Sequence, residues 1–467
     1  MEAEELALRV PKGFRFGVAT AAFQIEGAVR EDGRGLSGWD DFTRQPGRIL
    51  NGDTADTADD HYHRVAEDLT LMKRLGVDAY RFSISWPRVI PDGGHRVNAA
   101  GLAFYDRLVD QLLEAGISPT ATLYHWDTPL PLEQAGGWLN RNTAERLAEY
   151  ASVLGSALGD RVDQWITLNE PATVTLLGYG LGVHAPGKAL LFDGLPSAHH
   201  QLLAHGLAAQ ALRAAGVKGG IGVTNVHMPV VPASDSAEDA LFAQLFDLLQ
   251  NRIYADPVLL GHYPEVSGPL AEIFAALSEQ SAEDLAIIHQ PLDFYGLNYY
   301  APAKIAAGGG IATGNSEEAA AMSGLPFRLE SWPDHPVTAF DWPVVPEYFG
   351  VALTEQVERY GQALPPVYIT ENGTSCFDQL ADGEVADQAR IDYLAGHLAA
   401  AFEATAPGGP ASAMDLRGYY CWSLLDNFEW AAGYSQRFGL VYVDFETLTR
   451  TPKKSYDWYR RLIAASR

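Results

Sequence analysis

Gln164-Trp-Ile-Thr-Leu-Asn-Glu-Pro171 is a short run of apolar, β-forming residues that ends in a carboxylate, and it decides the fold. The same pattern recurs 201 positions later in Val367-Tyr-Ile-Thr-Glu-Asn-Gly373. Each run predicts a buried strand. An ionised carboxylate is unfavourable at a partly desolvated strand end unless it is paired, so Glu170 and Glu371 predict an acid/base pair.

Eight runs of this kind occur along the chain, at 14–19, 79–84, 119–124, 164–168, 220–226, 293–299, 367–370 and 418–424. Apolar residues at three- and four-residue spacing predict helices between them, near 65–75, 100–115, 142–158, 198–215, 237–253, 347–361, 387–403 and 455–465. Gly76 is expected to stop the first of these helices in a left-handed conformation. Asn142, followed by Glu145, is expected to be the N-cap of the third.

Strands that alternate with helices predict parallel pairing, and eight such units favour an α/β fold with a single (β/α)8 TIM barrel over residues 1–467. The active site of such a barrel lies at the C-terminal ends of its strands. The residues at the C-terminal ends of the predicted strands are mainly polar. They are Gln24, Arg81, His125, Asn169, Glu170, Asn225, Asn298, Tyr300, Glu371 and Trp422. A functional site at that end of the barrel is therefore expected.

The composition excludes several classes of partner. The chain has 59 Asp and Glu residues against 33 Lys and Arg, which gives a net charge of −26. An acidic surface of this size repels phosphate backbones and anionic bilayers, so neither nucleic acid nor a membrane is an expected partner. The acidic N-terminus, the lack of a long apolar run and only two cysteines predict a cytoplasmic protein.

Several longer motifs resemble glycoside hydrolase family 1, the β-glucosidase family. They are Phe14-Arg-Phe-Gly-Val-Ala-Thr-Ala-Ala-Phe-Gln-Ile-Glu-Gly27, Tyr80-Arg-Phe-Ser-Ile-Ser-Trp-Pro-Arg88, Leu123-Tyr-His-Trp-Asp127, Thr167-Leu-Asn-Glu-Pro171, His184-Ala-Pro-Gly187, Gly296-Leu-Asn-Tyr-Tyr300, Ile369-Thr-Glu-Asn-Gly373 and Trp422-Ser-Leu-Leu-Asp-Asn-Phe-Glu-Trp430. They follow the family's order almost from end to end. The resemblance implies a retaining, exo-acting β-glycosidase, most simply a β-glucosidase acting on cello-oligosaccharides or on aryl and alkyl β-glucosides.

The resemblance also implies roles for individual residues. Glu371 would be the nucleophile and Glu170 the general acid/base, with their carboxyl groups about 5–5.5 Å apart. Arg81 and Tyr300 would orient the nucleophile. The residues implied to contact substrate are Gln24, His125, Trp126, Asn169, Asn298, Tyr300, Trp422, Glu429, Trp430 and Phe438. No cofactor and no metal is expected, and a homo-oligomer is possible in this family.

Three alternatives stay open at this point. A 6-phospho-β-glycosidase shares the fold and both glutamates, but the Glu429-Trp430 pair places a carboxylate where it would repel a phosphate. A transglycosidase differs only in what intercepts the covalent intermediate. A non-catalytic sugar-binding barrel would usually have lost one of the glutamates. The run Ala306 to Gly324 is rich in Gly and Ala, and it predicts a loop at the entrance for the leaving group. The leaving group that the enzyme prefers is left open by the sequence.

Overall fold

Eight parallel strands form a closed barrel in the computed structural model, which describes residues 1–309, 322 and 324–467. The barrel strands are β1 (Arg15–Ala19), β2 (Ala79–Ser83), β3 (Ser118–Tyr124), β4 (Gln164–Asn169), β5 (Gly220–Val226), β7 (Phe294–Asn298), β10 (Val367–Asn372) and β11 (Leu416–Trp422). They follow one another around the barrel in chain order, and β1 closes it by pairing with both β2 and β11. The predicted (β/α)8 fold is confirmed.

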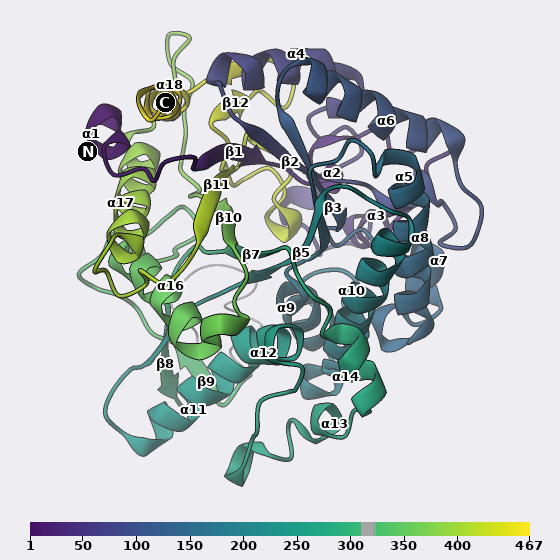
Figure 1. Ribbon diagram of the computed structural model, residues 1–467, viewed down its shortest axis with the longest axis vertical. Coiled ribbons are helices and arrows are strands. Elements are labelled where there is room, and N and C mark those ends of the chain that lie inside the picture. The colour runs from purple at the N-terminus through teal and green to yellow at the C-terminus, as the bar shows by residue number, and fades with distance from the viewer. Residues whose placement is uncertain (310–321, 323) are drawn as a thin grey trace.

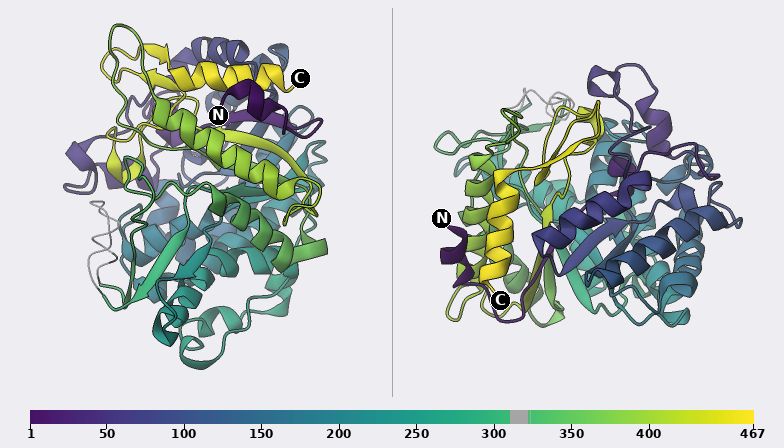
Figure 2. Two further views of the ribbon diagram at one scale, coloured as in Figure 1. Left: turned by 90° about the vertical axis from the view of Figure 1, so that its left-hand side faces the viewer. Right: turned by 90° about the horizontal axis from the view of Figure 1, so that it is seen from above.

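Helices surround the barrel strands (Figure 1). The longer ones are α4 (His61–Leu75), α6 (Ala99–Glu114), α8 (Asn142–Leu158), α10 (Pro196–Ala214), α11 (Ala237–Asp247), α12 (Ile253–Leu260), α14 (Ala282–Ile288), α16 (Glu347–Tyr360), α17 (Gln388–Thr405) and α18 (Lys454–Ala465). Shorter helices are α1 (Ala3–Ala7), α2 (Ala22–Ile25), α3 (Gly38–Thr43), α5 (Trp86–Val89), α7 (Leu130–Gln134), α9 (Pro171–Thr173) and α13 (Ala275–Ser278). Helices α1, α17 and α18 lie side by side, so the N-terminal segment packs against the last helix (Figure 2).

Two small sheets and several single helical turns extend the loops. The sheets consist of β6 (Val230–Pro232), β8 (Ala303–Ala307) and β9 (Phe327–Leu329), and of β12 (Val441–Val443) and β13 (Arg450–Pro452). The π-helical segments are η3 (Val174–Leu181) and η5 (Leu248–Arg252). The 3₁₀ turns are η1 (Leu50–Gly52), η2 (Gly137–Leu139), η4 (Leu191–Gly194), η6 (Gly268–Leu270), η7 (Gly361–Ala363) and η8 (Trp430–Ala432).

The helix boundaries test two capping predictions. Gly76 has φ +81° and ends α4, as its sequence position predicted. The N-cap prediction for Asn142 is wrong, because α8 begins at Asn142 and its N-cap is Arg141. The side chain that bonds there is that of Asn140, whose Oδ1 accepts from the backbone N–H of Asn142 at 3.0 Å. The side chain of Asn140 therefore provides a hydrogen-bond acceptor for the first backbone N–H of α8.

The core includes a part outside the strands and a part inside the barrel, and a third apolar cluster joins Phe23 and Trp39 to Trp430. The larger apolar cluster joins the strands to the surrounding helices. A smaller cluster includes Ile166, Phe294, Tyr368 and Tyr420, which come from four different barrel strands. The Tyr420 hydroxyl donates to Gln164 Oε1 at 3.0 Å, although β11 and β4 are not neighbours in the barrel. These side chains thus fill the barrel interior below its C-terminal end.

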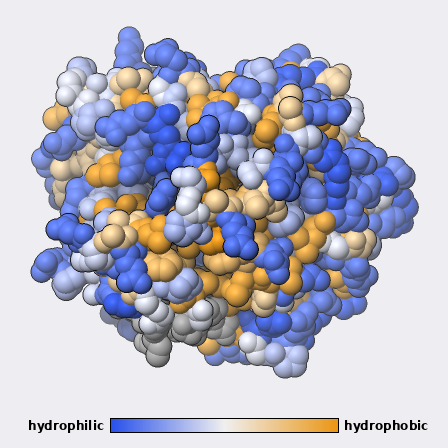
Figure 3. Space-filling model, turned by 90° about the horizontal axis from the view of Figure 1, so that it is seen from below, coloured by the Kyte–Doolittle hydropathy of each residue, from blue (hydrophilic) through white to orange (hydrophobic). Residues whose placement is uncertain are grey.

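The face of the molecule shown in Figure 3 is mainly hydrophilic toward its edges, in keeping with the acidic composition. Hydrophobic residues gather in the middle of one face, where the surface is hollowed (Figure 3). Among the described residues, no helix is long and apolar enough to cross a membrane.

Candidate active site

A cavity of about 520 Å³ opens at the C-terminal ends of the barrel strands, and both predicted glutamates line it. Glu371 lies within β10, and Glu170 directly follows β4. Glu170 is 6% exposed and Glu371 is 3% exposed. Two carboxyl groups from opposite parts of the sequence are therefore nearly removed from bulk water in one cavity.

Glu371 is held by a cation and a phenol. An Arg81 guanidinium N–H donates to Glu371 Oε1, and the Tyr300 hydroxyl donates to Oε2 at 2.7 Å. Arg81 is itself fixed by donating to Thr370 O at 3.0 Å and to Asn169 Oδ1 at 2.6 Å. Both oxygens of Glu371 accept hydrogen bonds, one of them from a fixed positive charge, and this arrangement favours the ionised carboxylate.

Glu170 has neutral partners instead. Asn298 Nδ2 donates to Glu170 Oε1 at 2.6 Å, and the Thr173 hydroxyl donates to Oε2 at 2.7 Å. Burial, followed by the negative charge of Glu371, raises the pKa of Glu170 to about 7, against the lowering effect of these hydrogen bonds and of Arg81. Glu170 therefore holds a proton up to about neutral pH.

The backbone around both glutamates is tightly constrained. Glu170 has φ +46°, in the left-handed region, and Pro171 then starts α9. After Glu371 and Asn372 the chain requires a glycine, since a Cβ on Gly373 would lie 1.7 Å from the carbonyl oxygen of Trp422. The last residues of β10 and β11 are thus in direct backbone contact, which fixes the nucleophile candidate relative to Trp422.

Buried polar atoms that have no protein partner among the described residues include Gln24 Oε1, His125 Nδ1 and Arg81 Nε. Gln24 donates its amide to Asn427 Oδ1 at 3.0 Å and to Glu429 Oε2 at 3.3 Å, while His125 Nε2 lies 3.2 Å from Asn169 Nδ2. Burial and the charge of Arg81 hold the pKa of His125 well below its usual range, so its imidazole is neutral. Atoms of this kind can form hydrogen bonds with a polar ligand or with water.

Aromatic rings surround these polar groups. Trp126, Trp422, Trp430 and Phe438 all line the cavity. Trp126 and Trp430 have their ring centroids 4.5 Å apart, and the His125 ring is stacked on that of Trp422 at 5.9 Å. Flat apolar faces beside orphaned donors and acceptors suit the alternating C–H and O–H surfaces of a sugar ring.

The structure brings nearly all the residues implicated by the sequence to this cavity. His125, Trp126, Glu170, Tyr300, Glu371, Trp422, Glu429, Trp430 and Phe438 line it directly. Gln24, Arg81, Asn169 and Asn298 bond to lining side chains instead. The Asn298 amide donates to Glu170, and its expected contact with substrate stays a prediction.

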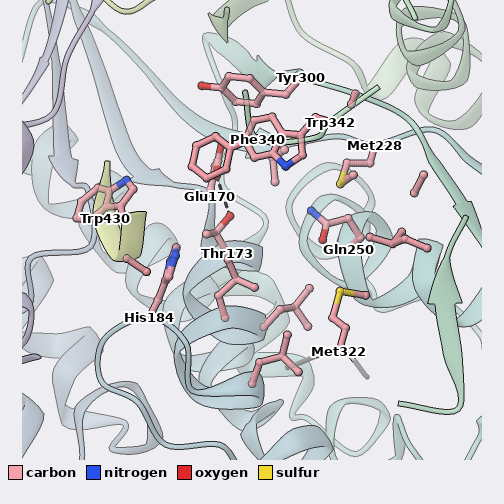
Figure 4. Close-up of a pocket in the computed structure, with 18 of the residues that line it drawn as sticks. Glu170, Thr173, His184, Met228, Gln250, Tyr300, Met322, Phe340, Trp342 and Trp430 are labelled. Atoms are coloured by element: carbon pink, nitrogen blue, oxygen red, sulfur yellow. Dashed lines mark hydrogen bonds between the residues drawn. The ribbon is translucent and has the colours of Figure 1, made fainter. Parts of the chain in front are cut away.

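Sequence reasoning missed Thr173 and the outer part of the cavity. The Thr173 hydroxyl bonds to Glu170, which lies three residues earlier (Figure 4). Side chains at this spacing meet on a helix, so the spacing was the sequence signal that could have identified Thr173. The predicted entrance loop, 306–324, falls mostly on residues 310–321 and 323, outside the described residues.

Comparisons with known proteins agree with this geometry. The sequence model of glycosyl hydrolase family 1 matches residues 7–467. Beta-glucosidase A of Thermotoga maritima is 43% identical over 97% of this chain and 98% of its own length. A bifunctional beta-D-glucosidase/beta-D-fucosidase of Bifidobacterium breve is 45% identical with the same coverages. The solved structure of a family 1 β-glucosidase from Thermotoga maritima is similar with a TM-score of 0.88, at 42% identity over 98% of each chain.

Proposed function

Because this chain belongs to glycosyl hydrolase family 1 and is therefore a retaining glycoside hydrolase, we propose that it is an exo-acting β-glucosidase with Glu371 as nucleophile and Glu170 as general acid and base. The observation that carries these roles is one cavity with two buried glutamates, of which one is paired with Arg81 and the other has a pKa raised to about 7. An ionised group and a protonated group are what the two roles require.

In the first step, a Glu371 oxygen attacks the anomeric carbon while Glu170 gives its proton to the glycosidic oxygen. The bond between the anomeric carbon and that oxygen breaks, the aglycone leaves as a neutral alcohol, and a covalent glycosyl-enzyme remains. Such a pair needs its carboxyl groups about 5–5.5 Å apart. The negative charge of Glu371 acts on Glu170 across the cavity and raises its pKa.

In the second step, Glu170 takes a proton from water, the water oxygen attacks the anomeric carbon, and Glu371 leaves as a carboxylate. Esterification of Glu371 removes the negative charge that raises the pKa of Glu170, so the acid becomes easier to ionise when a base is needed. Two displacements return the sugar with its original configuration. A sugar hydroxyl in place of water would give transglycosylation by the same route.

The glycone would be bound by the polar and aromatic groups at the inner end of the cavity. Gln24 Oε1 and His125 Nδ1 are the orphaned atoms that a pair of hydroxyls would satisfy. Asn169, fixed by Arg81, would contact the 2-hydroxyl next to the reacting carbon. Glu429 would accept from further hydroxyls, and the remaining aromatic contacts would come from Trp126, Trp422, Trp430 and Phe438.

Glucose is the proposed sugar, because relatives covering nearly the whole chain are named β-glucosidases. One relative is named for both glucosidase and fucosidase activity, and these sugars differ at the 4- and 6-positions that Gln24, Glu429 and Trp430 would contact. The same relatives do not favour a 6-phospho-β-glycosidase or a non-catalytic barrel.

Product stereochemistry tests the proposal. Proton NMR during hydrolysis of a β-glucoside should show β-glucose first, followed by mutarotation. Kcat/KM values for matched aryl glucosides, galactosides and fucosides should be highest for the glucoside or shared between glucoside and fucoside. Initial release of α-glucose, or no hydrolysis of any of the three, would refute it.

We propose further that residues 1–467 form one catalytic domain, since α1 packs against α18 and the family match reaches the last residue. A cytoplasmic location is supported by two unpaired cysteines, Cys376 and Cys421. The net charge of −26 supports the absence of nucleic-acid and membrane partners. Homo-oligomerisation stays a prediction.

A further inference from the structure

A fully buried lysine that does not line the cavity joins the two loops that follow β10 and β11. The Lys453 side chain is 0% exposed, and its Nζ donates to Asp378 Oδ2 and to Asp426 Oδ1, both at 2.6 Å. Asp378 lies in the loop after β10, and Asp426 lies in the loop after β11. Lys453 itself belongs to neither loop, because it directly precedes α18. One ammonium group therefore ties together the loops of two neighbouring barrel strands.

Two arginines extend this bridge into a buried ion-pair network. Arg390, on α17, donates to Asp378 Oδ2 at 2.7 Å and also to Asp387. Arg437 donates to Asp426 Oδ2 at 2.7 Å. With the lysine, three cations and three carboxylates alternate through the network and balance in charge. A carboxylate that moved away from its cations would be left buried and unpaired, which is strongly unfavourable, so the network holds both loops in one arrangement.

Asp426 directly precedes three residues that accept hydrogen bonds from Gln24. Gln24 Nε2 donates to Asn427 Oδ1 and to Phe428 O, each at 3.0 Å. It also donates to Glu429 Oε2 at 3.3 Å. Acceptors from consecutive residues thus surround one amide nitrogen, while the amide oxygen of Gln24 has no protein partner. A displacement of Asp426 would move these acceptors and turn the Gln24 amide.

The other end of the bridge belongs to the segment that carries the nucleophile. Asp378 follows Glu371 by seven residues in the sequence. Between them, the backbone N–H of Cys376 donates to Arg437 O at 3.1 Å, and Arg390 donates to the same carbonyl oxygen at 2.7 Å. The loop after the nucleophile is therefore attached to the loop after β11 through the backbone as well as through the lysine. The relative position of the two loops is set from outside the cavity.

Building on the proposed β-glucosidase function, we infer that Lys453 is a positioning residue for recognition of the sugar. By tying the two loops together, it sets the place of Gln24 and Glu429 relative to the nucleophile. These two side chains are the ones proposed to contact the 4- and 6-positions of the glycone. The adjacent Lys454 has opposite surroundings, because its side chain is 48% exposed and pairs with the exposed Glu384 at 2.6 Å. It therefore offers a matched control.

Lys453→Met removes the ammonium group and keeps the length of the side chain. Each aspartate of the bridge retains an arginine, so we expect a folded variant with a lower melting temperature. Its kcat/KM for 4-nitrophenyl β-D-glucoside should fall by about tenfold or more, because the hydrogen bonds to the 4- and 6-hydroxyls are misaligned. The loss should be at least about threefold smaller for the 4-deoxy and 6-deoxy glucosides, since each lacks one of these bonds.

The 2-deoxy glucoside is the internal control for this pattern. Its missing hydroxyl is the one that Asn169, on β4, is proposed to contact, so its fold-loss in Lys453→Met should equal that of the glucoside. Lys454→Met should behave as the unmodified enzyme with all four substrates. A residue that only stabilises the fold would lower the rates of the four substrates by the same factor.

A double variant, Lys453→Met with Asp378→Asn, separates positioning from charge balance. It removes one cation and one carboxylate, so Asp387 keeps Arg390 and Asp426 keeps Arg437. Its melting temperature, measured by circular dichroism, should exceed that of Lys453→Met because no buried carboxylate is left in excess. The bridge between the loops is still absent, so the smaller losses for the 4-deoxy and 6-deoxy glucosides should persist.

The outcomes separate this inference from the function on which it rests. Equal losses for all four substrates, no loss for any of them, or normal discrimination in the double variant would overturn the positioning role and leave the β-glucosidase intact. Failure of both variants to fold would make Lys453 a requirement of the fold and would also overturn that role. No hydrolysis of any glucoside by the unmodified enzyme would refute the proposed function itself.

Discussion

The ends of β4 and β10 carry the same side chain at nearly the same burial, yet their surroundings differ in charge. Glu371 accepts from the Arg81 guanidinium and from the Tyr300 hydroxyl, whereas Glu170 accepts from an amide and a threonine hydroxyl. Exposed fractions of 3% and 6% show that burial does not distinguish them. Glu371 has a positively charged partner, whereas Glu170 feels the negative charge of a neighbouring carboxylate. The same residue type can therefore take two different chemical roles.

The largest effect should come from Glu371→Ala. Without a nucleophile, we expect kcat for an activated aryl β-glucoside to fall by at least about 10⁴-fold. Azide should fill the space left by the carboxylate and give an α-glucosyl azide, identified by NMR. A β-azide, or activity close to that of the unmodified enzyme, would reverse the assignment of the two strand ends.

Glu170→Ala should have a somewhat smaller effect that depends on the leaving group. Loss of general acid catalysis should cost roughly 10²–10⁴-fold in kcat/KM for alkyl glucosides and much less for 2,4-dinitrophenyl β-glucoside, which needs no proton. Azide should then restore turnover of the glycosyl-enzyme and give the β-azide. Equal losses for both leaving groups would contradict the acid role.

Tyr300→Phe removes one donor from Glu371 and keeps the ring that meets Trp342 edge to face at 5.5 Å. Since a hydrogen bond to a charged group contributes about 1.5–3 kcal/mol, kcat/KM should fall roughly 10- to 100-fold. The measurement is steady-state kinetics, with circular dichroism as the control for folding. An unchanged rate would show that Arg81 alone holds the nucleophile.

The pH dependence of kcat/KM should report the difference between the surroundings of Glu170 and Glu371. Because Glu170 must be protonated to act as an acid, kcat/KM should decline as the pH rises through about 7. In Glu371→Gln the raising effect of the neighbouring charge is lost while Arg81 stays, so the pKa of Glu170 should be lower, as measured by NMR of labelled glutamate. No movement of that pKa would mean that burial alone sets it.

Thr173→Val should give the smallest change. The Thr173 hydroxyl stabilises the ionised form of Glu170, so its removal should raise the pKa of Glu170 and move the alkaline limb of the pH profile slightly upward. Thr70→Val, at an exposed hydroxyl on α4 that bonds only to its own helix, is the matched control. A shift in the opposite direction would contradict the hydrogen-bonding scheme.

Local sequence was sufficient for the barrel and for much of the site. The eight β-forming runs recur as strands that are buried along most of their length, and parallel pairing then collects their last residues at one end. Glu170, Glu371 and the tryptophans could be placed for this reason. The side chain that caps the helix beginning at Asn142 could not be identified, because Asn140 offers the same kind of side chain two positions earlier.

Contacts that depend on three-dimensional neighbours were beyond sequence reasoning. The hydrogen bond from the Asn298 amide to Glu170 is one example, because it depends on how β7 and β4 are placed around the barrel. The outer part of the cavity could not be predicted from the sequence for a different reason. Phe246 and Leu249 are apolar residues on helical segments, and in a sequence they are indistinguishable from residues that pack in the core.

Arg81 links residues that are far apart in the sequence, because it bonds to both Asn169 and Glu371. It comes from the second strand, and its carboxylate partner lies 290 residues later. A truncated product that stops before β10 would retain a cation meant for an interior position without its counter-ion, a defect that costs about 3–5 kcal/mol in other proteins. Because β1 pairs with β11, the barrel cannot close until its last strand has been synthesised, so the enzyme gains its closed fold and its paired active-site charges together.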